Sequence, residues 1–129
     1  MTDSDLIKAA LDARLRAYAP YSGFSVGAAL LMADGQLFTG SNVENISFGL
    51  TVCAERVAIG CAVQAGFTKV ARLAIAAESQ EPVVPCGACR QVLAEFNPAL
   101  HIISSTLTGV TQEFNLAILL PIHRRGILK

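Results

Sequence analysis

Hydrophobic positions repeat along the chain with two different spacings, which predict helices in some segments and strands in others. Residues 3–18 carry apolar side chains every three or four positions, the spacing of one face of an α-helix. These side chains are Ile7, Leu11, Leu15 and Tyr18. Asp3 or Ser4 is suited to cap this helix at its N-terminus, and Pro20 is expected to end it.

Two further helices are predicted at residues 53–65 and 86–96, and each is followed by a stop signal. Gly66 follows the first, where glycine commonly forms the C-terminal cap, and Asn97-Pro98 follows the second, where proline prevents the helix from continuing. Short apolar runs bounded by turn residues predict five β-strands, at residues 27–32, 36–40, 70–76, 101–105 and 110–114. A last helical turn is expected at residues 117–120.

The order of these elements indicates an α/β fold. A helix, two strands, a helix, a strand, a helix and two strands follow one another along the chain. Asp34-Gly35 predicts a hairpin between the first two strands, and Thr108-Gly109 predicts a turn between the last two. We therefore expect a mixed five-stranded sheet with helices on both faces, a three-layer α/β/α arrangement. A chain of 129 residues has the length of one domain, which we expect to span residues 1–129.

The composition narrows the classes of partner. The formal net charge is zero, whereas a protein that binds a polynucleotide usually presents a basic surface, so nucleic acid is not an expected partner. No apolar run reaches the ~18 residues that a membrane-spanning helix needs. Near the N-terminus, Asp3 and Asp5 stand where a secretory signal would have an apolar segment. We therefore expect a cytoplasmic protein that does not bind membranes.

Two short cysteine motifs are the candidates for chemistry. Cys-Ala-Glu-Arg at residues 53–56 opens one predicted helix, and Pro-Cys-Gly-Ala-Cys-Arg at residues 85–90 opens the next. Cys86 and Cys89 are three residues apart, so both thiols lie on one face of a helix and can bind the same ion. Three thiolates with a fourth position left open form a catalytic zinc site. We therefore predict one zinc ion per chain, bound by Cys53, Cys86 and Cys89.

The neighbours of Cys53 carry the other groups that such a site needs. Glu55 can move protons beside the open coordination position, which makes it the candidate catalytic residue. Arg56 lies three residues after Cys53 and can donate hydrogen bonds to the thiolates, which offsets their negative charge. The fourth cysteine, Cys61, lies in the middle of an apolar helix and is expected to be a core residue.

The cysteines could also serve a redox role or a purely structural one. A Cys-x-x-Cys pair alone can be a redox dithiol, although that role would leave Cys53 and Glu55 without a function. A structural zinc site would need a fourth protein ligand. Only His101 and His123 are available as outside candidates, and neither stands at ligand spacing from the cysteines.

The pairing of Cys-x-Glu with a downstream Pro-Cys-x-x-Cys resembles the zinc-dependent nucleoside and nucleotide deaminases. Residues 20–30 (Pro-Tyr-Ser-Gly-Phe-Ser-Val-Gly-Ala-Ala-Leu) are similar to the opening strand of small cytidine deaminases, and residues 40–45 (Gly-Ser-Asn-Val-Glu-Asn) to their ribose-binding segment. The chain is identified on these motifs as a member of the cytidine deaminase family, of the type with three cysteine ligands. The resemblance implies hydrolytic deamination of cytidine and deoxycytidine to uridine and deoxyuridine, with release of ammonia, in pyrimidine salvage.

The resemblance also implies the residues that bind the substrate. Asn42 and Glu44 would hydrogen-bond the ribose hydroxyls, Phe24 would contact the pyrimidine ring, and the backbone N–H of Ala54 would lie near the base. A carboxylate at position 44 would repel a phosphate, which favours a nucleoside over a nucleotide. A deaminase of a related aminopyrimidine nucleoside, such as a cytosine-containing antibiotic, is the alternative.

The resemblance further implies a homotetramer. Apolar residues make up 53% of the chain and charged residues only 16%, and a monomer would expose part of this apolar surplus to water. A dense core rich in alanine is the alternative way to accommodate the surplus. Arg124 stands where the family usually has a phenylalanine that reaches the pocket of a neighbouring subunit.

Overall fold

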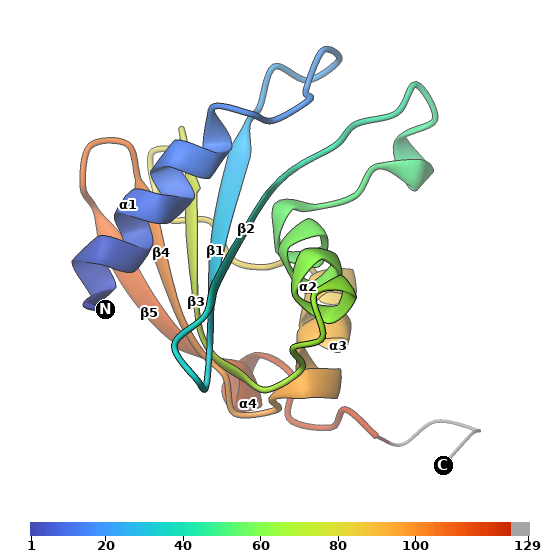
Figure 1. The fold of residues 1–129 in the computed structure, drawn as a ribbon. Coiled ribbons are helices and arrows are strands. Elements are labelled where there is room, and N and C mark those ends of the chain that lie inside the picture. The colour runs from blue at the N-terminus through green and yellow to red at the C-terminus, as the bar shows by residue number, and fades with distance from the viewer. Residues whose placement is uncertain (125–129) are drawn as a thin grey trace.

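The computed structural model describes residues 1–124, which form a central sheet with helices around it (Figure 1). The strands are β1 (Val26–Met32), β2 (Leu37–Ser41), β3 (Val70–Ala77), β4 (His101–Thr106) and β5 (Thr111–Asn115). The helices are α1 (Asp3–Arg14), α2 (Ala54–Gln64), α3 (Gly87–Phe96) and α4 (Leu116–Leu119), and a short 3-10 helix covers Phe48–Leu50. The predicted elements are confirmed, and all except the first helix begin and end within one residue of their predicted bounds.

The five strands form one mixed sheet in the order β2-β1-β3-β4-β5. Strand β1 pairs antiparallel with β2 and with β3, β3 pairs parallel with β4, and β4 pairs antiparallel with β5. A parallel pair needs a crossover connection, and α3 provides it, because this helix lies between β3 and β4 in the chain. The prediction of a mixed five-stranded sheet is therefore confirmed.

Helices cover both faces of the sheet, which confirms the three-layer α/β/α arrangement (Figure 1). On one face, Leu6 and Ala10 of α1 join a cluster with Ala29, Ala74 and Ile103 of the sheet. On the opposite face, α2 and α3 cover a larger cluster, whose members include Leu30, Ala58, Ile75, Leu93 and Ile102. No helix within residues 1–124 is long and apolar enough to cross a membrane.

The first helix differs from the prediction at both ends. Thr2 is its N-cap, where we expected Asp3 or Ser4: the Thr2 hydroxyl accepts a hydrogen bond from the N–H of Asp5, and the Asp5 carboxylate accepts one from the N–H of Thr2. This reciprocal pair is a capping box, which satisfies two N–H groups at once. The helix ends at Arg14, well before Pro20.

The buried face of α1 also differs from the predicted one. The buried side chains are Leu6, Ala10 and Ala13, whereas Leu15 and Tyr18 lie beyond the helix and are exposed. The reason is the close approach of α1 to β1: a Cβ atom on Gly27 would lie 1.9 Å from the carbonyl oxygen of Ala10. At this closest point the small side chain of Ala10 faces the sheet, Leu6 fills the space one turn earlier, and Ile7 and Leu11 are only partly buried against the cluster.

A second glycine allows the same approach on the other face. A Cβ atom on Gly40 of β2 would lie 2.5 Å from the backbone nitrogen of Ala58 and 2.6 Å from the carbonyl oxygen of Ala54, both in α2. Backbone atoms within a helix cannot move aside as the end of a flexible side chain can. The distance between β2 and α2, and with it the position of Cys53, therefore depends on glycine at position 40.

Gly40→Ala is expected to lower the free energy of unfolding by about 1–3 kcal/mol, because the added methyl group meets the backbone of α2. Urea denaturation at a fixed protein concentration would measure the change. Gly60→Ala is the matched control, since Gly60 is exposed in α2 with open space around its Cα, and alanine there should stabilise the helix by ~0.5–1 kcal/mol. Equal stability of Gly40→Ala and the wild type would contradict a close approach of β2 and α2.

Candidate active site

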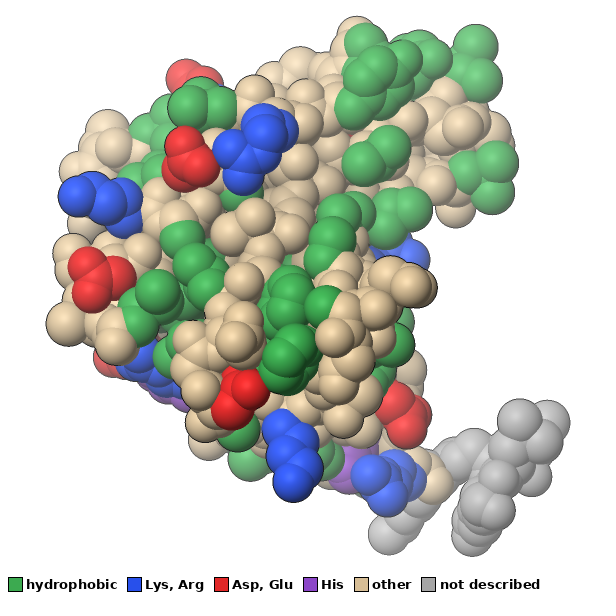
Figure 2. Space-filling model, viewed as in Figure 1, with side chains coloured by type: hydrophobic (Ala, Val, Ile, Leu, Met, Phe, Trp, Pro, Cys, Tyr) green, Lys and Arg blue, Asp and Glu red, His purple; other side chains and the backbone are tan. Residues whose placement is uncertain are grey.

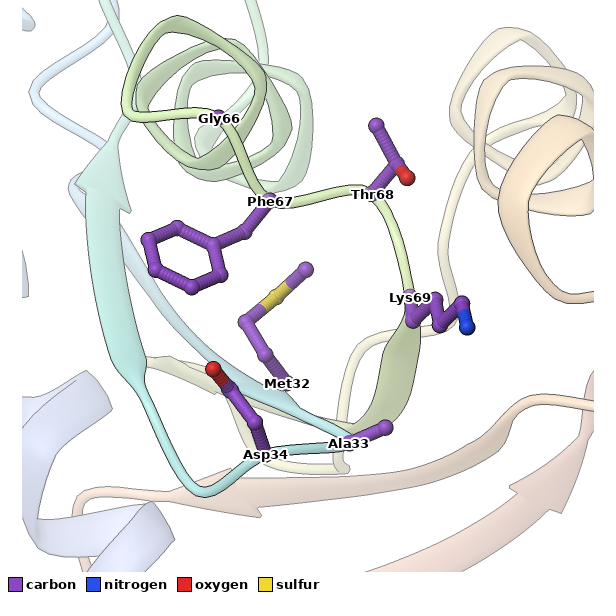
Figure 3. Close-up of a pocket in the computed structure, with 7 residues that line it drawn as sticks. All are labelled: Met32, Ala33, Asp34, Gly66, Phe67, Thr68 and Lys69. Atoms are coloured by element: carbon purple, nitrogen blue, oxygen red, sulfur yellow. The ribbon is translucent and has the colours of Figure 1, made fainter.

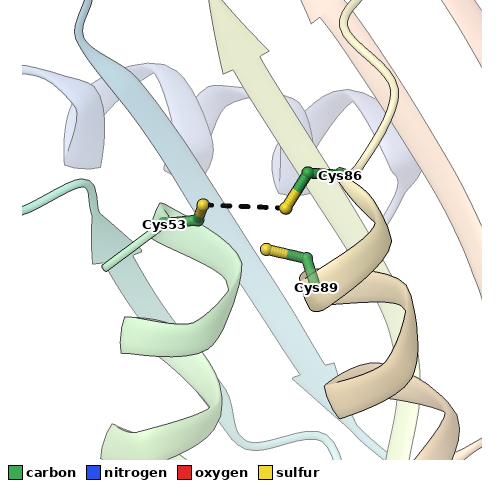
Figure 4. A group of neighbouring side chains, drawn as sticks. All are labelled: Cys53, Cys86 and Cys89. Carbon is green, nitrogen blue, oxygen red and sulfur yellow. Dashed lines mark hydrogen bonds between the residues drawn. The ribbon is translucent and has the colours of Figure 1, made fainter. Parts of the chain in front are cut away.

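Three of the four cysteines meet where α2 and α3 begin (Figure 4). The sulfur atoms of Cys53, Cys86 and Cys89 all lie within 4.8 Å of one another, and the sulfurs of Cys53 and Cys86 are 3.9 Å apart. Cys53 is the N-cap of α2 and Cys86 the N-cap of α3, each with an extended backbone, while Cys89 lies in the first turn of α3. The structure thus brings together the three cysteines that we predicted as metal ligands.

The geometry of the thiols fits a zinc ion. Two sulfurs that each lie ~2.3 Å from a tetrahedral zinc are ~3.8 Å apart, which agrees with the 3.9 Å between Cys53 and Cys86. Among residues 1–124, no imidazole or carboxylate joins this group as a fourth ligand. Three protein ligands leave one coordination position open, as in a catalytic zinc site and unlike a structural one.

Arg56 lies beside Cys53, as predicted from their spacing. Its Nη2 donates to the sulfur of Cys53 at 3.6 Å and to the carbonyl oxygen of Thr51 at 3.4 Å. This contact places a positive charge next to the thiols without making Arg56 a metal ligand. The first turns of α2 and α3 add partial positive charge at the same point.

The thiols share their protons unequally. The pKa of Cys53 is lowered to about 5, chiefly by a hydrogen bond from Cys89 and further by Arg56, although burial opposes the change. The pKa of Cys89 is raised, because the hydrogen bond to Cys53 and burial both keep the proton on Cys89. The thiol of Cys53 therefore loses its proton easily, whereas Cys89 holds its proton. A bound cation would take the place of the proton on Cys89.

Glu55 lies in the first turn of α2, with only 5% of its surface exposed. Burial raises the pKa of its carboxyl group, and the negative charge of Cys53 raises it further. A carboxyl group with a raised pKa can donate a proton as well as accept one near neutral pH. The structure therefore puts a candidate proton carrier beside the three sulfurs.

A cavity of about 320 Å³ lies against this group. The predicted site residues on its wall are Phe24, Asn42, Cys53, Ala54, Glu55 and Cys86. Its apolar wall includes Ile75 of β3 and the valines of the segment before α3, Val83 and Val84, which were not predicted from the sequence. No local signal marks these side chains, since only the crossover from β3 to α3 brings them to the cavity.

A second cavity, of about 380 Å³, lies between the β1–β2 hairpin and the segment after α2 (Figure 3). Met32 and Phe67 supply its apolar lining, and Asp34 and Lys69 also border it. None of the predicted site residues lines this cavity, and it has no cysteine or histidine. The cavity beside the thiols is therefore the candidate active site.

Asn42 and Glu44 are buried, and both are hydrogen-bonded to residues at or just before the start of β1. Asn42 accepts from the N–H of Val26 through Oδ1 at 2.9 Å and donates through Nδ2 to the carbonyl oxygen of Phe24 at 2.8 Å. The Glu44 carboxylate accepts from the N–H groups of Tyr21 and Ser22 and from the Ser22 hydroxyl. Asn42 lines the cavity, whereas Glu44 is not among its lining residues.

Arg90 is a further residue whose position the sequence did not reveal. Its Nε donates to the carbonyl oxygen of Pro85 at 2.8 Å, and its Nη1 donates to the carbonyl oxygen of Leu119 at 3.3 Å. Arg90 thus ties the residue directly before Cys86 to α4. Both acceptors are backbone atoms, which carry no signal in the sequence.

The prediction that Cys61 is a core residue is wrong. Cys61 is exposed and does not belong to the group of three thiols. The buried side of α2 carries Ala54, Glu55, Ala58, Ile59 and Ala62, and Cys61 lies on the other side. Because α2 has apolar residues on nearly all sides, their spacing alone did not show which side packs against the sheet.

Comparison with known proteins agrees with this site. Residues 1–105 match the family model of the cytidine and deoxycytidylate deaminase zinc-binding region. The chain is 51% identical over 117 residues to a cytidine deaminase of Halalkalibacterium halodurans, which covers 90% of this chain and 89% of the relative. A cytidine deaminase of Sporosarcina psychrophila is 47% identical over 117 residues, with coverage of 90% and 86%.

Solved structures give the same result. The crystal structure of cytidine deaminase from Burkholderia pseudomallei superposes with a TM-score of 0.91 at 47% identity, and covers 94% of this chain and 98% of that one. The residues matched by the family model include all three clustered cysteines and Glu55. A zinc-binding family and a zinc-compatible group of thiols together identify zinc as the cofactor. The chain belongs to the cytidine deaminase family.

Proposed function

We propose that this protein deaminates cytidine and deoxycytidine to uridine and deoxyuridine, with uptake of water and release of ammonia, as a step of pyrimidine salvage. The observation that carries this proposal is a buried Glu55 beside three thiols that leave one position of a zinc ion open. The adjoining cavity of about 320 Å³ has the size of a site for a small organic ligand. Unbridged thiols that bind metal suit a reducing compartment such as the cytoplasm.

Cys53, Cys86 and Cys89 would hold the zinc ion, which when bound supplies a water molecule of lowered pKa. Zinc with three thiolates has a net charge near −1, which would weaken this effect. Arg56 offsets part of that charge through its hydrogen bond to Cys53, and the N-terminus of each of α2 and α3 offsets more. Residues outside the ligand set thus keep the site electrophilic.

Glu55 carries the protons of the reaction. It accepts a proton from the attacking water and delivers it to ring nitrogen N3, which makes C4 of the pyrimidine more electrophilic. The oxygen of that water adds to C4, and Glu55 then takes the remaining proton from the C4 hydroxyl group and passes it to the amino group. The C4–N bond breaks, ammonia leaves, and the C4 carbonyl of the product forms. One carboxyl group can serve both directions because burial raises its pKa toward the working range.

The substrate would lie between Phe24 and the start of α2. Phe24 lines the cavity with part of its ring exposed and is placed to contact the pyrimidine, while Ala54 offers its backbone N–H to the base. Asn42 keeps one amide N–H for a sugar oxygen after its bond to Phe24. The carboxylate of Glu44 behind this wall disfavours a phosphate, so we propose nucleosides as the substrates.

We also propose that the protein is a homotetramer. Exposed apolar side chains gather on residues 43–52, which project from the sheet with the segment around Tyr18 (Figure 1 and Figure 2). Ile46 is 80% exposed and Phe48 66% exposed, although both are large apolar residues. The core is rich in alanine as well, but that does not account for apolar side chains on the surface.

Removal of a ligand should remove the metal. Cys86→Ala is expected to reduce the zinc content from one ion per chain to well below half, because two thiolates hold zinc far less tightly than three. Elemental analysis of the purified protein would measure this content. Cys61→Ala is the matched control, since Cys61 is free, exposed and outside the group of thiols. Full zinc content in Cys86→Ala would exclude this residue as a ligand.

Glu55→Gln keeps the shape of the side chain and removes its ability to accept and donate a proton. Cytidine turnover, followed by the ultraviolet change to uridine, should fall by at least ~10²–10⁴ while the zinc content and the fold persist. Activity within tenfold of the wild type would mean that another group carries the proton.

The assembly can be tested by sedimentation at micromolar concentration. Four chains of 13.6 kDa are expected to move together. Ile46→Asp should shift the protein toward smaller species, because a charge cannot be buried in an apolar contact without a partner. Sedimentation of the wild type as a monomer with full activity would disprove the tetramer.

A further inference from the structure

Ser22 connects two residues of the proposed substrate site. Its hydroxyl donates to Oε2 of Glu44 and accepts from the backbone N–H of Phe24 at 2.9 Å. The other oxygen of Glu44 accepts from the N–H of Tyr21 at 3.0 Å and from that of Ser22 at 3.1 Å. A single hydroxyl therefore links the carboxylate of Glu44 to the backbone of the residue proposed to contact the base.

The segment that carries Phe24 has little else to fix it. Residues 19–25 lie between α1 and β1 without regular helix or strand, and Gly23 has a positive φ of 69°. From outside, Asn42 and Glu44 hold this segment by hydrogen bonds, and the ring of Phe48 meets that of Tyr21 edge to face with centroids 6.2 Å apart. Of these contacts, only the hydrogen bonds reach Ser22 and Phe24. Ser22 itself does not line the cavity, so any effect on substrate must pass through its neighbours.

Loss of the Ser22 hydroxyl would leave two groups without partners. An ionised carboxylate offers about four acceptor positions, and three of those on Glu44 are used by residues 21 and 22. Without the hydroxyl, Oε2 of Glu44 loses its donor and the N–H of Phe24 loses its acceptor. The Glu44 carboxylate and the N–H of Phe24 would then be free to turn toward water. Phe24, which lines the cavity, would no longer be held in place by Ser22.

We propose that Ser22 is a positioning residue that sets affinity for the nucleoside by holding Phe24 and Glu44 in the binding arrangement. The effect is on binding rather than on chemistry, because Glu55 and the thiols do not contact this network. A preformed wall lowers the cost of ordering the segment when the substrate binds. This role rests on the proposed deaminase function.

Steady-state kinetics with cytidine would test the positioning role of Ser22. Ser22→Ala should raise KM about tenfold, the usual effect of losing one hydrogen bond to a charged group, with kcat within about twofold and zinc content unchanged. Ser22→Thr keeps the hydroxyl at an exposed position and should restore KM. Ser25→Ala, which removes a hydroxyl of the same segment outside this network, should match the wild type.

A double variant tests whether Ser22 acts through Glu44. In a Glu44→Ala background, Ser22→Ala should change kcat/KM by less than about threefold, because the hydroxyl has lost its main partner. The same tenfold effect in both backgrounds would show that Ser22 does not act through Glu44 and would overturn the proposed positioning role. A fall in kcat at constant KM would indicate fewer active molecules and would overturn it too.

The two proposals fail in different ways. A zinc-loaded wild type that does not deaminate cytidine would overturn the proposed function, and the role of Ser22 with it. Normal turnover by the wild type with an unchanged KM in Ser22→Ala would overturn the role of Ser22 alone.

Discussion

Mutual repulsion of three thiolates is the constraint around which this structure is arranged. Sulfur atoms held within 4.8 Å of one another repel strongly once ionised, so the fold must supply positive charge at the same point. It does so by starting two helices there and by placing Arg56 beside Cys53. The position of α2 depends in turn on Gly40, which lets that helix lie against β2. A metal ion then completes a group of charges that the backbone has already assembled.

The substrate side of the cavity is built on a different principle. Residues 19–25 have no regular structure, and buried side chains on a neighbouring segment hold them in place. Asn42 and Glu44 therefore have a structural role, whatever they also contribute to a bound sugar. Side chains with both roles tolerate little change, because a substitution that weakens binding also releases the loop.

Local chemistry is the reason that most elements could be predicted. Helices α2 and α3 begin at cysteine motifs and end shortly before Gly66 and Asn97-Pro98, signals that depend on a few neighbouring residues. The buried strands are short apolar runs between turn residues. Predictions failed where the side chains of a helix suited more than one face, as for the stripe on α1 and for Cys61 in α2. In both helices, packing on the sheet determined which side chains are buried, and the spacing of apolar residues alone could not show this.

The sequence by itself determined the chemistry of this protein: three thiols, a neighbouring carboxyl group and an arginine, at spacings that resemble a known family of deaminases. These spacings carry information because residues three apart at the start of a helix meet the same ion. The tertiary structure alone decided which distant groups join them. The crossover from β3 to α3 brings Val83 and Val84 to the cavity, and backbone carbonyls of Pro85 and Leu119 fix Arg90. Backbone atoms and long-range neighbours have no signature in a sequence, so only the folded chain shows them.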